Sequence, residues 1–204
     1  NKLKILYKLL NMKEIIKDHF DLSLKTLINT KEEINKIKII SEKLVSKINS
    51  NRNIFVFGNG GSLADSAHFV GELTATYMKK RKALPFFLLN SNIASVSAWS
   101  NDFNFEDYAT RELSGYAKKK DALIILSTSG GNYKKNQSIN LIKLAKFAKK
   151  NKIFLISLLG KGGGEILKFS DMSIVIKSNN TATIQEMHKI ILHSICGYLD
   201  SHIK

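Results

Sequence analysis

From residue 53 onward, short apolar runs alternate with segments long enough to form helices. The runs cover residues 54–57, 86–89, 122–126, 153–158 and 172–176. Each run is almost continuously hydrophobic, which is typical of strands buried on both faces of a parallel sheet. The segments between and after the runs are predicted helices, at about 62–78, 92–99, 107–118, 138–150, 161–168 and 181–203. This alternation predicts an α/β fold, a doubly wound (flavodoxin-like) five-stranded parallel sheet flanked by helices.

Residues 13–50 have a different pattern, in which apolar residues recur at three- and four-residue spacing. This spacing predicts amphipathic helices, and Thr30 followed by Glu33 is a capping-box signature for the start of a second helix. We therefore divide the chain into N-terminal helices at 1–50 and an α/β domain at 51–204, which together form one globular unit. The apolar stripe of the N-terminal helices could face the core or a partner subunit.

Composition limits the classes of protein to which the chain can belong. The formal net charge is +15, but only three of the 32 basic residues are arginine. Because bidentate recognition of bases and phosphates favours arginine, we predict no nucleic-acid partner. No apolar run approaches the roughly 18–20 residues of a membrane span, and the N-terminal residues lack a signal-peptide cleavage site. Without an apolar run of that length we expect no membrane partner. The single cysteine, Cys196, can form no intrachain disulfide, which fits a reducing compartment, so we expect a cytoplasmic protein.

A glycine-rich turn, Gly58-Asn59-Gly60-Gly61-Ser62 (the glycine loop), joins the first predicted strand to a predicted helix. Free backbone N–H groups and the helix dipole attract an anion at such a junction, and glycine lets the ligand come close. The loop matches neither the nucleoside-triphosphate P-loop pattern nor the dinucleotide pattern G-x-G-x-x-G. His68 and Glu72, four residues apart, share one face of the following helix. Together these features predict an enzyme that acts on a phosphorylated small molecule.

A second candidate phosphate-binding turn, Ser127-Thr128-Ser129-Gly130 (the serine loop), directly follows the run at 122–126. Three hydroxyls beside free N–H groups can surround an oxyanion, and parallel α/β sheets bind ligands at the carboxyl ends of their strands. The last predicted helix carries Gln185, His188 and His193. A histidine on a mostly apolar helix is more often a core residue than a ligand, and the residues alone do not choose between the two histidines.

Six motifs in this order resemble the sugar isomerase (SIS) domain family, and more narrowly its phosphoheptose isomerases. The motifs are Gly58–Ser62, His68 with Glu72–Thr74, Asn101–Phe103, Ser127–Gly130, Gly160–Gly163 and Ile184–His188 with His193. The resemblance runs from about residue 13 to the end. It implies an SIS domain that converts sedoheptulose 7-phosphate into D-glycero-D-manno-heptose 7-phosphate for bacterial surface polysaccharide, either lipopolysaccharide or capsule. It also implies a homotetramer with active sites at subunit interfaces.

The resemblance also implies a role for each matched residue. Glu72 matches the general base and His193 the second acid–base residue. A zinc site found in some members matches His68, Glu72, Gln185 and His193. The other matched positions are substrate contacts: Asn59, Gly60, Gly61, Ser62, Glu72, Asn101, Asp102, Ser127, Thr128, Ser129, Ser138 and Gln185.

This assignment agrees with the chemistry of aldose–ketose isomerisation. One carboxylate can remove a proton beside the carbonyl and return it to the neighbouring carbon through an enediol. A histidine can move the second proton between O1 and O2, and zinc could polarise the carbonyl. Gln185 and His193 are eight residues apart, about 12 Å along a helix, so a shared ion would be held more easily by ligands from two subunits.

Three departures from the family pattern lie near the expected phosphate position. Residues 131–136 form an apparent insertion, so Ser138, or alternatively Asn132, takes the place of the family's last phosphate-contacting serine. Thr76 and Thr183 stand where the family usually has arginine. Lys134 and Lys135 on the insertion could supply the missing positive charge, and the alternative is a solvated loop.

Two other functions remain open at this point. The missing arginines allow an SIS isomerase that acts on a different phosphosugar. The third possibility is a non-catalytic SIS protein that binds a partner, as one relative binds the replication initiator DnaA. That relative lacks the acid–base pair, whereas Glu72 and His193 are both present in this chain, which favours catalysis.

Overall fold

The computed structural model describes the backbone of residues 2–203 and the side chains of residues 12–203. Residues 1 and 204, at the outer bounds of the two predicted segments, lie outside the described residues. The sheet has five strands: β1 (Ile54–Gly58), β2 (Phe86–Leu88), β3 (Ala122–Ser127), β4 (Phe154–Leu159) and β5 (Met172–Val175). All pairings are parallel, in the order β2-β1-β3-β4-β5. The predicted doubly wound, five-stranded parallel sheet is therefore confirmed, with its topological switch point between β1 and β3.

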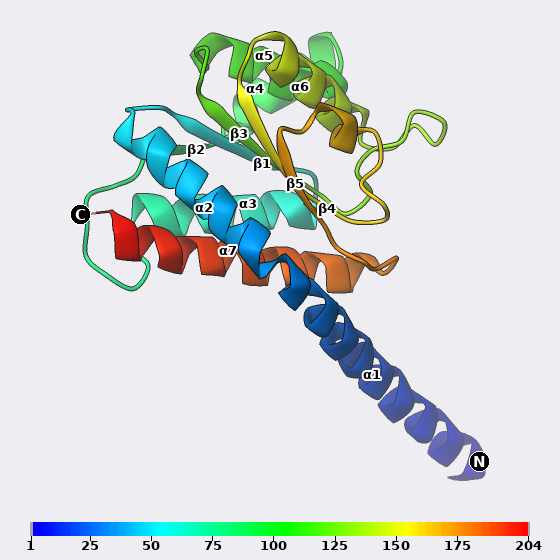
Figure 1. The fold of residues 1–204 in the computed structure, drawn as a ribbon. Helices are drawn as coiled ribbons and strands as arrows, with labels where there is room; N and C mark the ends of the chain where they lie inside the picture. The colour runs from blue at the N-terminus through cyan, green and yellow to red at the C-terminus, as the bar shows by residue number, and fades with distance from the viewer. Residues whose placement is uncertain (1, 204) are drawn as a thin grey trace.

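Helices cover both faces of the sheet (Figure 1). The helices that follow the first strand are α3 (Gly61–Thr74), α4 (Ile93–Asp102), α5 (Phe105–Tyr116), α6 (Ile139–Lys150) and α7 (Thr181–His202). Alternate strand residues belong to two buried clusters, because successive side chains of a strand point to opposite faces. Ile54 and Val56 pack with α3 and α7, whereas Phe55 and Phe57 pack with α5 and α6.

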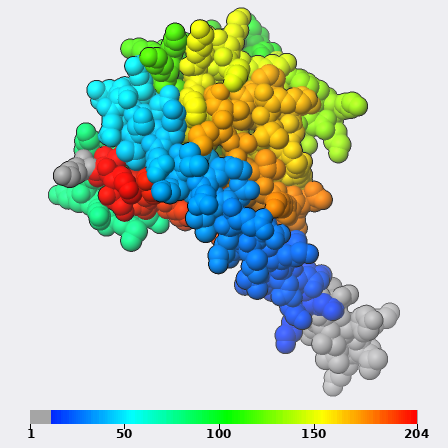
Figure 2. All heavy atoms as spheres, in the orientation of Figure 1, coloured from blue at the N-terminus to red at the C-terminus, as the bar shows by residue number. Residues whose placement is uncertain are grey.

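The N-terminal segment forms two helices, α1 (Lys2–Thr30) and α2 (Ile34–Asn49), joined by a 3-10 turn. α2 packs on the sheet and contributes Ile40 and Leu44 to the core, while α1 extends away from the body (Figures 1 and 2). The capping box predicted at Thr30 is wrong. The Thr30 hydroxyl donates to the carbonyl of Thr26 within α1, at 2.8 Å, instead of capping α2.

The predicted helix at 161–168 is also wrong. Residues 161–164 all have positive φ, and only one 3-10 turn, Ile166–Phe169, follows them. Four successive left-handed residues cannot belong to a right-handed helix. The predicted helix at 62–78 ends early, at Thr74, and an irregular connection leads from there to β2. Among the described residues, no helix has the length and apolar character needed to span a bilayer.

Candidate active site

The glycine loop and the serine loop lie side by side, because β1 and β3 are neighbours in the sheet and both loops follow their carboxyl ends. Asn59 and Asn140 exchange two amide hydrogen bonds, at 2.9 and 2.7 Å, which fix the glycine loop to the start of α6. Gly60 has φ +55°, a left-handed conformation that favours glycine. A Cβ at Gly61 would collide with the side chain of Gln185. The glycine therefore allows α7 to bring Gln185 against the start of α3.

The serine loop is held by its own hydroxyls. Ser127 Oγ accepts from the N–H of Gly130 at 3.1 Å, and Ser129 Oγ accepts from the N–H of Gly131 at 3.2 Å. The Ser129 and Ser138 hydroxyl oxygens are 3.4 Å apart. These contacts gather three serine hydroxyls around one turn, where they could bind a phosphate together.

The insertion at 131–136 forms a small loop that returns the chain to the serine loop. Backbone hydrogen bonds between Asn132 and Gln137 close this loop, at 2.9 and 3.0 Å. The Asn132 side chain accepts from the N–H of Lys135 inside the insertion, at 3.1 Å. The geometry therefore favours Ser138 over Asn132 as the residue that joins the serine loop.

His68, Glu72 and His193 form an acid–base cluster between α3 and α7. His68 Nε2 lies 3.1 Å from His193 Nε2 and 3.2 Å from Glu72 Oε1. The Tyr77 ring stacks on His193, with centroids 5.9 Å apart and planes 14° apart. His68 and Glu72 keep 47% and 26% of their side-chain surface exposed, so a substrate can reach the cluster. No local pattern in the sequence indicates Tyr77, because its partner lies far along the chain.

His188, the competing histidine, belongs to the core. It is fully buried, its Nε2 lies 3.4 Å from the carbonyl oxygen of Leu159, and its Nδ1 has no hydrogen-bond partner among the described residues. Burial lowers the pKa of His188 to about 4, against a small opposing effect of that carbonyl. The ring is therefore neutral near pH 7, and the geometry selects His193 as the histidine that faces Glu72 and His68.

Because His188 is buried, we expect the free energy of unfolding to fall in acid. The unfolded histidine binds a proton below about pH 6.5, whereas the folded one does so only below about pH 4. Between these values the unfolded state holds more protons, so stability falls as the pH falls, by about 3 kcal/mol over the whole window. Urea unfolding from pH 7 to 4 measures this loss, and His188→Leu should flatten the curve. An unchanged slope in that variant would contradict the assignment.

Two predicted substrate contacts, Asn101 and Asp102, do not contact the acid–base cluster within one chain. Asn101 and Asp102 lie at the exposed end of α4, where Asn101 Nδ2 donates to Asp102 Oδ1 at 2.9 Å. Among the described residues, neither of them bonds to the two loops or to the cluster. A cavity of about 640 Å³ lies elsewhere, between β2 and α5, and none of the predicted site residues lines it.

The predicted zinc ligands come together only in part. His68, Glu72 and His193 converge, and two imidazoles with one carboxylate are a donor set that zinc accepts. Gln185 makes no hydrogen bond to these three within the described part of the chain. No group of three or more His, Cys, Asp or Glu side chains described by the structure has an arrangement that could hold a metal ion. A single chain therefore offers the right donor types without a complete ligand shell.

Comparison with known proteins agrees with this architecture. A family model described as SIS domain matches residues 19–160. The chain belongs to the SIS domain family. Within that family, a probable phosphoheptose isomerase from Thermoplasma volcanium is 38% identical over 83% of this chain and 84% of its own length.

Two solved SIS-domain structures extend the likeness over nearly the whole chain. A phosphoheptose isomerase from Francisella tularensis has a TM-score of 0.86 at 26% identity, covering 92% of this chain and 97% of its own. Phosphoheptose isomerase GmhA from Neisseria gonorrhoeae has a TM-score of 0.84 at 27% identity, covering 93% and 99%. The resemblance to the phosphoheptose isomerases of the SIS family is therefore confirmed.

Proposed function

We propose that this chain isomerises sedoheptulose 7-phosphate to D-glycero-D-manno-heptose 7-phosphate for heptose biosynthesis. The observation that carries the proposal is the acid–base cluster, in which Glu72 and His193 both lie within hydrogen-bond distance of His68. The glycine loop and the serine loop offer donors for a phosphorylated sugar, and the relatives described above are phosphoheptose isomerases.

Glu72 and His193 of the acid–base cluster each have a defined task in the proposed reaction. The ketose has its carbonyl at C2, and Glu72 removes a proton from C1 to give an enediol. Glu72 then returns a proton to C2, while His193 gives a proton to O2 and takes one from O1. The serine loop binds the phosphate, with Ser127, Thr128, Ser129 and Ser138 as donors. Asn59, Gly60, Gly61, Ser62 and Gln185 contact the sugar.

We include a zinc ion in this proposal. His68, Glu72 and His193 offer donor types that zinc accepts, but their arrangement in the described part of a single chain does not by itself hold an ion, so Gln185 or a group from a second subunit would have to complete the site. Bound zinc would polarise the substrate carbonyl and stabilise the negative charge of the enediolate. Elemental analysis of the purified protein is expected to find one zinc per subunit.

A homotetramer is also part of the proposal, with α1 at a subunit interface. His19 and Ser23 of α1 both bond to Glu186 of α7, at 2.7 and 2.6 Å, which fixes one side of α1 to its own chain. Large apolar side chains elsewhere on α1 are exposed by 58–71%: Ile15, Ile16, Phe20, Leu24 and Ile28. Figure 2 shows this helix projecting from the body, so a second subunit is needed to cover it.

Charged substitutions on α1 test the assembly. Phe20→Glu combined with Ile28→Glu is expected to convert the tetramer into smaller species, because each buried carboxylate would lack a partner. Light scattering after size-exclusion chromatography measures the change. Lys17→Glu on the same helix is the control. A double variant with the mass of the parent assembly would contradict a role for this face.

The lysines of the insertion provide a third test. Lys134 and Lys135 are exposed, and their role in phosphate binding stays a prediction. Replacing both with alanine is expected to raise the KM for sugar phosphate about tenfold with little change in kcat, because a weakened ion pair affects ground-state binding. Replacing Lys149 and Lys150, at the far end of α6, is the control. An unchanged KM would leave the insertion as a solvated loop.

The missing arginines keep a second candidate function in view. Thr76 and Thr183 stand where the family usually has arginine, so an SIS isomerase for another ketose phosphate is the runner-up. Incubation with sedoheptulose 7-phosphate and, separately, with ketopentose and ketohexose phosphates distinguishes the two by NMR of the aldose products. We further propose that the protein works in the cytoplasm without a nucleic-acid or membrane partner.

A further inference from the structure

Arg81, in the irregular connection between α3 and β2, forms a buried ion pair with Asp200 of α7. Arg81 Nε donates to Asp200 Oδ1 at 2.7 Å, and the two side chains are only 3% and 2% exposed. Most of the other residues in the connection are open to solvent, as Met78 shows with 76% exposure, although Leu84 is buried. Charged side chains are rarely buried so deeply unless their partners are well placed, so this pair needs an explanation.

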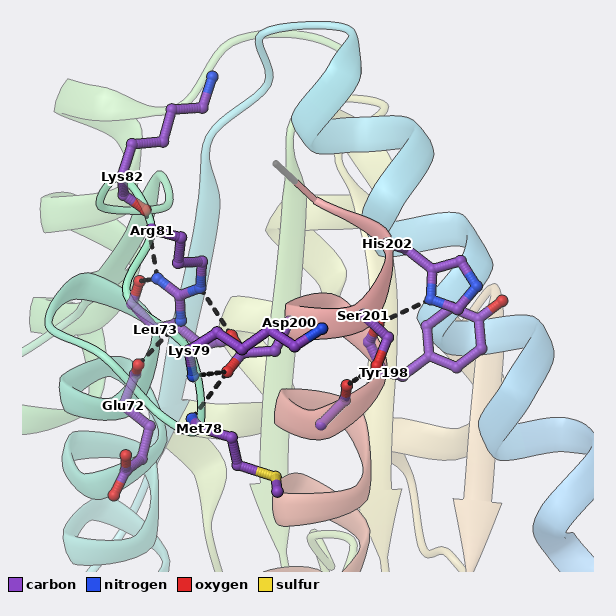
Figure 3. A network of polar contacts seen from close by, with 11 residues as sticks. Glu72, Leu73, Met78, Lys79, Arg81, Lys82, Tyr198, Asp200, Ser201 and His202 are labelled. Carbon is purple, nitrogen blue, oxygen red and sulfur yellow. Dashed lines mark hydrogen bonds and ion pairs between the residues drawn. The ribbon is translucent and has the colours of Figure 1, made fainter.

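Arg81 holds the last turn of α3. Its Nη2 donates to the carbonyl oxygen of Glu72 at 3.0 Å, and its Nη1 donates to that of Leu73 at 2.8 Å. Carbonyls in the last turn of a helix lack intrahelical partners, and a cation there also suits the helix dipole. Figure 3 shows that the Glu72 carboxylate points away from Arg81. Arg81 therefore fixes the main chain of Glu72 and leaves its carboxylate free.

Asp200 joins the connection to α7. Its Oδ2 accepts from the N–H groups of Met78 at 2.8 Å and Lys79 at 3.1 Å, in addition to the bond from Arg81 (Figure 3). Burial alone would raise the pKa of Asp200, but these three hydrogen bonds hold it below the ordinary value. The carboxylate therefore stays ionised and remains an acceptor for all three donors.

The same connection reaches the second half of the acid–base cluster. Tyr77 stacks on His193, and the Tyr77 ring also lies over Gly197 of α7, where a Cβ would be in ordinary van der Waals contact with it at 3.9 Å. His193 and Asp200 are seven residues apart, about two turns, and thus lie on nearly the same face of α7. The segment at residues 77–81 therefore joins α3, which carries Glu72, to α7, which carries His193.

We propose that Arg81 and Asp200 are positioning residues, whose ion pair sets α3 against α7 and with it the separation of Glu72 and His193. The inference rests on the proposed roles of those two residues in isomerisation. Arginine suits this position because its planar fork bonds to Asp200 and to two helix carbonyls at once. A lysine, with a compact ammonium group, cannot reproduce these directions.

The simpler alternative is that the Arg81–Asp200 pair only stabilises the fold. Steady-state kinetics distinguish this structural role from the positioning role. In Arg81→Lys and Asp200→Asn, kcat is expected to fall about 10- to 100-fold while KM changes less than about threefold, because misplaced catalytic groups slow the chemical step. Leu113→Ala is the matched control, since Leu113 is fully buried on the opposite face of the sheet. It should lower the unfolding temperature and leave kcat unchanged.

A second readout needs no substrate. The imidazole signals of His68 and His193 are recorded by NMR at one fixed pH, and their chemical shifts are expected to change in Arg81→Lys but not in Leu113→Ala. Absence of turnover by the unmodified chain would contradict the proposed function, and these spectra would still decide on the ion pair. Unchanged chemical shifts in Arg81→Lys would overturn the positioning role.

A double variant keeps the inference testable if Arg81→Lys or Asp200→Asn fails to fold. Arg81→Met with Asp200→Leu removes both charges and leaves no unpaired ion, so the fold is expected to persist. We expect this folded variant to be as slow as Arg81→Lys, because it lacks the bonds to the Glu72 and Leu73 carbonyls. Full activity in the double variant, or losses in Arg81→Lys no greater than in Leu113→Ala, would overturn the inference.

Discussion

Replacing Glu72 with glutamine is expected to lower kcat for the isomerisation by about 10²- to 10⁴-fold, with little change in KM. Glutamine keeps the size of the side chain, but its amide cannot accept a proton from C1 of the ketose. Glu72 is 26% exposed and its nearest described polar partner is His68, so the substitution leaves the core intact. Steady-state kinetics with sedoheptulose 7-phosphate measure the loss.

Glu106→Gln is the matched control for this prediction. Glu106 is half-buried, with 41% of its side-chain surface exposed, lies in the first turn of α5 and pairs with Lys143, away from the acid–base cluster. Its substitution should leave both kinetic constants unchanged. If Glu72→Gln retained more than about a tenth of the activity of the unmodified chain, Glu72 could not be the proton carrier.

Replacing His193 with alanine is the second large effect that we expect. The group that moves a proton between O1 and O2 is lost, and kcat should fall about 10²- to 10³-fold. The same variant should lose bound zinc, because His193 supplies one of the two converging imidazoles. Activity and zinc content are measured on the same preparation, so the catalytic and ligand roles can be compared directly.

His202→Ala on the same helix is the control for His193. His202 is exposed at the end of α7 and stacks on Tyr198, so its loss should change neither kcat nor zinc content. A His193→Ala variant with normal zinc and normal kcat would contradict both roles. Loss of zinc without loss of activity would remove the metal from the proposal and would also count against His193 as the acid–base group.

Most of the sheet could be predicted because its strands are buried on both faces. Such strands are nearly continuous apolar runs, and the predicted bounds at 54–57 and 122–126 differ from β1 and β3 by one residue. The helix predicted at 161–168 is wrong because only its place between two strands favours a helix, while its three successive glycines favour left-handed backbone. The capping box failed because the Thr30 hydroxyl found an acceptor inside its own helix.

The site could be predicted where its signal is local. The two loops and the His68–Glu72 spacing are short motifs, and the structure brings the two loops together at the carboxyl ends of β1 and β3. The choice between His188 and His193 was open because it depends on which face of α7 packs on the sheet. The Arg81–Asp200 pair joins residues 119 positions apart and has no local pattern, so only the folded chain reveals it.

Isomerisation in D₂O tests the central claim, that Glu72 removes a proton from C1 of the ketose phosphate and delivers one to C2. The protein is incubated with sedoheptulose 7-phosphate, and NMR follows the aldoheptose phosphate and the deuterium at its C2. The account predicts turnover by the unmodified chain, with deuterium at C2 because the Glu72 carboxyl exchanges its proton with solvent between the two steps, and almost no product for Glu72→Gln. Absence of aldose from the unmodified chain, or equal turnover by Glu72→Gln, would contradict it.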